Sequence, residues 1–174
     1  MINIAIFHSV YSVRITIGNA ATNFKLHPRE LHYEHYVKLG RDHPQWNMTV
    51  HPANCTRQEF YKAIQQCDVF IHYGSNAALE GMIIDRPIVT LNILKDIYIS
   101  NHWLKALDME NACLNVDIDG NITQTIIRAL SDEPELKQKR KNIVDLLCGK
   151  LDGKAATRIV QFMYEVAEWN EKKR

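Results

Sequence analysis

Two short groups of polar residues in this chain have the types and positions that can bind phosphate. The first is Gly74-Ser75-Asn76, which follows an apolar run and precedes a helical pattern. A serine or asparagine at that point can cap the helix, and the free backbone N–H groups and the positive dipole end can hold a phosphate. Glu80, further along the same helix, is placed to bind a neighbouring hydroxyl pair such as a ribose. The alternative is that Ser75 is only an N-cap and Glu80 a solvated helix residue.

The second group surrounds a proline and consists of Lys25, His27 and Arg29. These side chains can supply hydrogen-bond donors and positive charge to a diphosphate, and the proline after His27 fixes the backbone there. Taken alone, His27 is better explained as a capping or packing residue, and its pairing with Ser75 is what favours phosphate binding. His72 comes late in an apolar run, where it is either a hydrogen-bonded core residue or part of a pocket wall.

Both groups follow strands in an alternating pattern of strands and helices. Apolar runs predict strands over residues 2–8, 23–26, 48–51, 69–72, 88–91 and 112–116. Helical patterns cover residues 30–40, 57–66, 121–130, 133–147 and 153–168, with a further helix between 76 and 88, and Thr56 and Glu59 form the sequence of a capping box. We therefore expect an α/β, Rossmann-like domain of three layers with a mostly parallel sheet. Ligands collect at the carboxyl ends of the strands in such sheets, so both polar groups are expected at one edge.

Length and composition limit the classes of protein. The chain has 174 residues, 46% of them apolar, which suits one compact domain over residues 1–174. Its 21 basic and 20 acidic residues give a net charge of +1, which offers no overall electrostatic basis for binding nucleic acid or an anionic membrane. The four cysteines are scattered, which suggests neither a zinc site nor a disulfide framework. No signal peptide and no transmembrane segment is apparent, so we expect a cytoplasmic protein.

Three segments resemble the C-terminal, donor-binding domain of GT-B-fold glycosyltransferases. Lys25-Leu26-His27-Pro28-Arg29-Glu30 is similar to their Lys-x-His-Pro segment, residues 67–89 to their block of strand, serine turn, acidic helix and second strand, and residues 152–159 to the start of their last helix. The resemblance keeps this order over about residues 23–162. It applies particularly to the bacterial surface-polysaccharide group of capsule synthesis enzymes, glycerophosphate transferases and sialyltransferases. The UDP-GlcNAc 2-epimerases share the architecture.

The resemblance implies a substrate and roles for these residues. The substrate would be a nucleotide-activated sugar, or a CDP- or CMP-activated donor such as a glycerophosphate donor, used in surface or capsule polysaccharide synthesis. His27, to which we assign the catalytic role, would contact the donor's phosphates. Ser75 and Asn76 would hold phosphate at the helix N-terminus, and Glu80 would bind the ribose. No metal or cofactor is implied, because the helix dipole and side-chain donors can stabilise the leaving nucleotide.

GT-B enzymes have two Rossmann-like domains, and the first normally supplies the acceptor site. Only 22 residues precede Asn23 here, so we expect one half of a GT-B fold, without the acceptor domain. Transfer would then need a separate acceptor-binding subunit, and whether the chain is an enzyme by itself stays open. Two alternatives remain: an epimerase-like domain acting on UDP-GlcNAc, and a non-catalytic interaction protein whose exposed apolar face serves self-association as a homo-oligomer or binds a partner.

Overall fold

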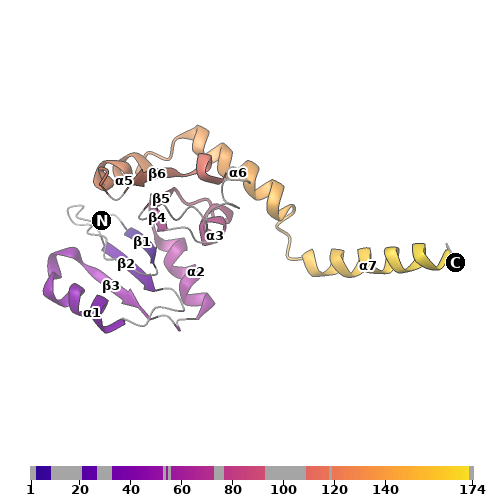
Figure 1. The fold of residues 1–174 in the computed structure, drawn as a ribbon, viewed down its shortest axis with the longest axis horizontal. Helices are drawn as coiled ribbons and strands as arrows, with labels where there is room; N and C mark the ends of the chain where they lie inside the picture. Colours follow the sequence, from indigo (N-terminus) through magenta and orange to yellow (C-terminus); the bar gives the residue numbers. More distant parts are fainter. Residues whose placement is uncertain are drawn as a thin grey trace.

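The chain alternates strands with helices through the part that its computed structural model describes, residues 3–8, 21–26, 33–52, 54, 56–72, 77–92, 109–117 and 119–172 (Figure 1). The strands are β1 (Asn3–His8), β2 (Ala21–Leu26), β3 (Met48–His51), β4 (Val69–His72), β5 (Ile88–Asn92) and β6 (Leu114–Asp117). The α-helices are α1 (Tyr33–Asp42), α2 (Arg57–Gln66), α3 (Ala77–Ile83), α5 (Ile122–Leu130), α6 (Pro134–Cys148) and α7 (Ala155–Lys172).

The strands form one parallel sheet. Its six strands lie in the order β3-β2-β1-β4-β5-β6, and every neighbouring pair is parallel. The chain moves outward from β1 to β3 on one side, returns to the middle, and moves outward again from β4 to β6. This is the strand order of doubly wound α/β proteins, in which the direction of progress reverses next to the first strand. The expected α/β class and parallel sheet are confirmed.

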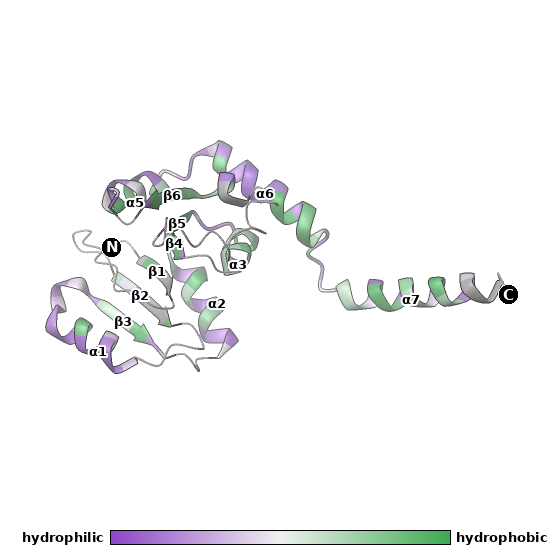
Figure 2. Ribbon diagram, viewed as in Figure 1, coloured by the Kyte–Doolittle hydropathy of each residue, from purple (hydrophilic) through white to green (hydrophobic). Residues whose placement is uncertain are grey.

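Apolar clusters cover both faces of this sheet. One cluster joins Tyr36 of α1 and Ile126 of α5 to Val69 and Ile71 of β4. The other places Phe70, which points to the opposite face, against buried residues of α2, α3 and α6. Successive side chains of a strand alternate between faces, so β4 is buried along its whole length and its sequence is almost continuously apolar. In Figure 2, hydrophobic colour appears both on strands and on helices that pack against the sheet, such as α2 and α3.

Local capping signals fix several helix boundaries. The hydroxyl of Thr56 accepts a hydrogen bond from the backbone N–H of Glu59 at 3.2 Å, and the Glu59 carboxylate accepts one from the backbone N–H of Thr56 at 2.7 Å. This is the predicted capping box, and α2 ends at Gln66 as expected. The backbone and side-chain hydrogen bonds from Thr56 lower the pKa of Glu59. The Asn121 side chain caps α5 by accepting from the N–H of Gln124 at 2.9 Å.

Other boundaries differ from the predictions for local reasons. The last strand begins at Leu114 rather than at residue 112, because Met109–Ala112 forms a 3-10 turn. The final helix begins at Ala155 rather than at residue 153, because Gly153 has a φ of +72°, outside the right-handed helical region. It then continues to Lys172, beyond the predicted end at residue 168. The first predicted helix is observed from Tyr33 to Asp42, and its residues 30–32 lie outside the described part.

Helix α3 packs so closely on the sheet that Gly81 has no room for a side chain. A Cβ atom there would lie 2.9 Å from Cδ1 of Phe70 and 3.3 Å from Cδ1 of Ile88, both of which are buried. We expect Gly81→Ala to lower the free energy of unfolding by about 1–2 kcal/mol, because the strain of overpacking exceeds the gain in helix propensity. Urea unfolding measures this change.

Gly40 in α1 is the matched control for this substitution. Its Cβ would lie 3.4 Å from the flexible end of Met48, an ordinary van der Waals contact. Gly40→Ala should therefore stabilise the protein by up to about 1 kcal/mol, as expected for a helical glycine. If both substitutions stabilise the protein equally, α3 is not held against the sheet at this distance.

Candidate functional site

The two predicted phosphate-binding groups follow the two strands that flank β1. Leu26, the last residue of β2, is level with His8 of β1, and His72, the last residue of β4, is level with Phe7. Neighbouring strands lie about 4.8 Å apart, so the chain leaves the carboxyl ends of β2 and β4 at points about 10 Å from each other. The reversal of the sheet lies between these points, where α/β proteins form their ligand crevices.

The described residues include only part of the predicted site. Lys25 lies in β2, one residue before the strand ends, and its side chain is not described. His27 and Arg29 follow β2 and lie outside the described residues, as do Gly74, Ser75 and Asn76 between β4 and α3. Their roles stay predictions, whereas His72 and Glu80 are placed directly by the structure.

His72 is buried at the end of β4, with 1% of its surface exposed. Its Nε2 atom lies 3.0 Å from the hydroxyl oxygen of Thr90 on the neighbouring strand β5, which is a hydrogen bond. Burial lowers the pKa of His72 to about 4, because the charged imidazolium would lose its hydration. The imidazole is therefore neutral at pH 7, and it links β4 to β5 beside the reversal point. Direct contact with a ligand stays a prediction.

Glu80 lies in the first turn of α3 and is half-buried. The hydroxyl of Tyr61, on α2, donates a hydrogen bond to Oε1 of Glu80 at 3.4 Å. Before it in the same helix, Ala77 and Ala78 are buried against the sheet. The first turn of α3 thus brings small side chains next to the segment that follows β4. The tyrosine partner of Glu80 could not be anticipated from the sequence, since the two residues lie on different helices.

Further polar pairs line the same edge of the sheet and were not identified from the sequence. Asn92 ends β5 and Asp117 ends β6, and the Asn92 amide donates to the Asp117 carboxylate at 3.2 Å. On the other side of the reversal, Nε2 of His51 lies 3.4 Å from Oδ1 of Asn23. The sequence did contain a signal for this polar edge. Every described strand except β2 ends on a histidine, an asparagine or an aspartate. The carboxyl edge is therefore polar where an α/β domain binds ligands.

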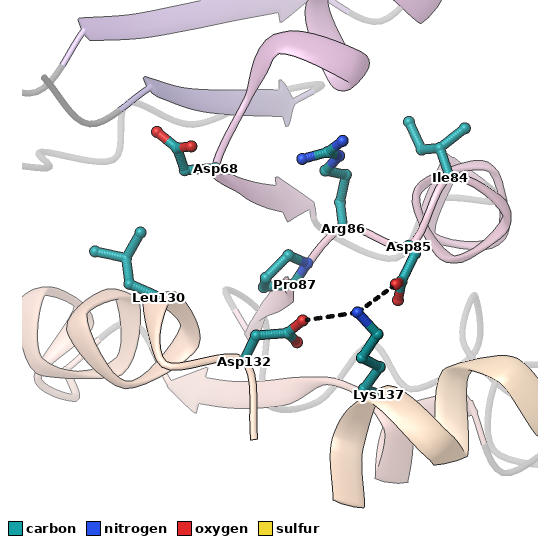
Figure 3. Close-up of a pocket in the computed structure, with 8 residues that line it drawn as sticks. All are labelled: Asp68, Ile84, Asp85, Arg86, Pro87, Leu130, Asp132 and Lys137. Carbon is teal, nitrogen blue, oxygen red and sulfur yellow. Dashed lines mark ion pairs between the residues drawn. The ribbon is translucent and has the colours of Figure 1, made fainter. Parts of the chain in front are cut away.

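The opposite edge of the sheet, where the strands begin, contains an ion-pair network. A cavity of about 490 Å³ there is lined by residues of both charges and apolar neighbours, namely Asp68, Ile84, Asp85, Arg86, Pro87, Leu130, Asp132 and Lys137 (Figure 3). Nζ of Lys137 lies 2.8 Å from Asp85 and 3.9 Å from Asp132. Arg140, which is 1% exposed, donates to the same two carboxylates at 3.1 and 2.6 Å.

This ion-pair network ties three segments together. It joins α6 to the turn between α3 and β5 and to the turn between α5 and α6. Partial burial disfavours the ionised form of Asp85, but the hydrogen bonds and charges of Lys137 and Arg140 outweigh burial and lower the pKa of Asp85. Because Asp85, Asp132, Lys137 and Arg140 bind one another, we interpret the network as a structural element rather than a ligand site.

Within the described ranges, no group of three or more histidine, cysteine, aspartate or glutamate side chains is arranged to hold a metal ion. No helix in those ranges combines the length and the apolar character needed to cross a membrane. The sequence matches no known family model, and no curated protein is significantly similar to it.

Proposed function

We propose that this chain is the donor-binding domain of a glycosyltransferase-like protein of surface-polysaccharide synthesis, one half of a GT-B fold. It would bind a nucleotide-activated sugar or glycerophosphate donor at the carboxyl edge of the sheet, and a second domain or a partner would supply the acceptor. The observation that carries the proposal is the strand order, which reverses between β1 and β4. The segments with the two phosphate-binding sequences follow the strands on either side of β1, at the same edge.

The chemistry of these segments suits a nucleoside diphosphate. Lys25, His27 and Arg29 would bring cationic and N–H donors to one side, and Ser75 and Asn76, which precede α3 in the sequence, would bring donors to the other. A diphosphate held between them would leave its ribose near α3, where the half-buried carboxylate of Glu80 can accept hydrogen bonds from hydroxyl groups.

Transfer of the sugar leaves negative charge on the departing nucleotide. Donors fixed in advance around that charge stabilise the transition state more than the bound substrate, and this is the catalytic role we propose for His27. Because the GT-B acceptor site belongs to the other domain, the residues described here would recognise the donor and stabilise the leaving group, and a second domain or a partner would orient the acceptor.

Calorimetric titration of the chain with UDP, CDP and CMP tests this proposal. We expect one of the three to bind, and Ser75→Ala to weaken its Kd about tenfold to a hundredfold, since a hydrogen bond to a charged group contributes about 1.5–3 kcal/mol. Ser131→Ala is the matched control, because Ser131 lies at the opposite edge and its hydroxyl donates to the backbone carbonyl of Arg128 at 2.6 Å. Equal weakening by both substitutions, or none by Ser75→Ala, would contradict the assigned site.

A further inference from the structure

Helix α7 presents an unusually large apolar surface to solvent. It has 18 residues and projects away from the body of the domain, with the C-terminus at its far end (Figure 1). All side chains from Ala155 to Trp169 are exposed, and the large apolar ones expose 40–70% of their surface: Ile159, Val160, Phe162, Met163, Tyr164, Val166 and Trp169. A helix of this length gains most of its stability from packing, and contiguous apolar surface of this extent marks an interaction site.

The apolar residues of α7 form two adjacent rows. Figure 2 shows hydrophobic colour recurring along this helix. The first row repeats with spacings of four and three residues: Ala155, Ile159, Phe162, Val166 and Trp169. This is the seam of a coiled coil, with the β-branched Ile159 and Val166 at one of its two positions and the aromatic residues at the other. The second row lies about 100° around the helix and consists of Ala156, Val160, Met163 and Ala167.

The charged residues beside the first row can form ion pairs with the same residues of a second copy of the chain. Arg158 and Glu165 lie seven residues apart on the side of the first row that faces away from the second. When two copies of α7 pair in antiparallel orientation, Ile159 packs beside the partner's Phe162. In this register Arg158 faces the partner's Glu165. Two-fold symmetry makes the same ion pair form a second time, between the partner's Arg158 and Glu165. A parallel pair would place Arg158 beside the partner's Met163 and form no such ion pair. Exposed pairs of this kind set orientation more than affinity.

The available apolar area is sufficient for a dimer. Each large exposed side chain of the two rows offers on the order of 100 Å², less than a fully buried aromatic ring contributes. Leu146 at the end of α6 and Leu151 in the connection to α7 are also exposed, at 73% and 57%. In the antiparallel arrangement Trp169 reaches the partner's Leu151. The four large seam residues, the flanking Met163 and Leu151 together offer about 600 Å² per partner, which is at the lower end of the range for specific interfaces.

From these observations we propose that α7 is a homodimerisation helix, which pairs in antiparallel orientation with α7 of a second copy through the Ile159, Phe162, Val166 and Trp169 seam. The proposal is independent of nucleotide binding. A membrane surface is a less suitable binding partner for α7. The negative charges of Glu165 and Glu168 offset the positive charge of Arg158 on the polar side, so the helix lacks the basic face that anionic lipids attract.

Sedimentation and light scattering of the full chain test the dimer. The wild type should have a mass of about 40 kDa at micromolar concentration, twice the 20.2 kDa of the chain. Phe162→Glu should raise the dimer dissociation constant about thirtyfold or more, as loss of a central apolar anchor does. Tyr164→Glu is the control, since Tyr164 lies outside both rows, and should leave the dimer intact. A monomeric wild type, or a dimer that Phe162→Glu does not weaken, would overturn the proposal.

Exchange of the flanking charges tests the orientation. Glu165→Arg should weaken the antiparallel dimer several-fold by placing two arginines opposite each other, and adding Arg158→Glu should restore part of the loss. Restoration is expected to be partial because Arg158 also binds Asp152 at 2.8 Å within its own chain. If neither substitution changes the dissociation constant, the antiparallel pairing is wrong. Binding of the wild type to phosphatidylserine vesicles through the same face would instead favour a membrane role and overturn the dimer.

Discussion

Replacing Arg140 with alanine should lower the free energy of unfolding by about 1.5–3 kcal/mol, the usual contribution of a hydrogen bond between charged groups. Arg140 is 1% exposed, and its Nη2 atom binds both Asp85 and Asp132, at 3.1 and 2.6 Å. Both aspartates have positive φ angles, 55° and 43°, so the turns that hold them are conformationally unfavourable unless something fixes them. Without the guanidinium, only the exposed ammonium of Lys137 still ties α6 to both turns within the described part of the chain.

Chemical unfolding monitored by circular dichroism measures this loss, with Lys137→Ala as the matched control. Lys137 binds the same Asp85 at 2.8 Å, but its side chain is 56% exposed. Because solvent screens an exposed pair, Lys137→Ala should cost much less than Arg140→Ala. Similar small losses for the two substitutions would mean that burial of Arg140 does not make the network important for stability.

Acidification should destabilise the protein through His72 before most carboxylates respond. Burial lowers the pKa of His72 from 6.5 to about 4. The unfolded state therefore takes up a proton at higher pH than the folded state, so stability rises with pH between about 4 and 6.5 and is complete above that range. Going from about pH 7 to about pH 4.5 should remove about 2 kcal/mol, and the loss approaches about 3 kcal/mol as the pH falls through 4.

His72→Gln separates this effect from other titrations, because glutamine can still hydrogen-bond to Thr90 but does not titrate. The variant should have a flatter dependence of unfolding free energy on pH between about 4.5 and 7. Asp85 acts in a different window: its pKa lies below 3.8, so its contribution is present above that value and is lost only as the pH falls through the lowered pKa. Identical pH profiles for variant and wild type would show that His72 is accessible to protons in the folded state.

Much of the fold could be predicted because its signals are local. The capping box at Thr56 and the apolar run of β4 lie within a few neighbouring residues, and both predictions are confirmed. The ion-pair network could not be predicted, because Arg140 and Asp85 are 55 residues apart and each resembles an ordinary surface charge in the sequence. The extension of α7 to Lys172 was also missed, since its charged end has the composition of a frayed terminus.

The candidate site was predictable to a lesser degree. The strand order depends on long-range packing, which the sequence does not reveal directly. The observed order supports the expectation that the chain leaves the sheet at one edge after Leu26 and after His72. The sequence left two interpretations of His72, and burial with a hydrogen bond to Thr90 explains why a polar residue ends an apolar strand. The roles of His27 and Ser75 depend on side-chain positions that only a ligand can test.

Nuclear magnetic resonance of the ¹⁵N-labelled chain, titrated with UDP and CDP, tests the central claim most directly. If the carboxyl edge binds the donor, the amide signals that shift should belong to the segments after β1, β2 and β4 and to Ala77 and Ala78 in the first turn of α3. The signals of Asp85 and Lys137, at the opposite edge, should stay unchanged. Shifts confined to the ion-pair network, or no shift with either nucleotide at saturating concentration, would contradict the proposed donor site.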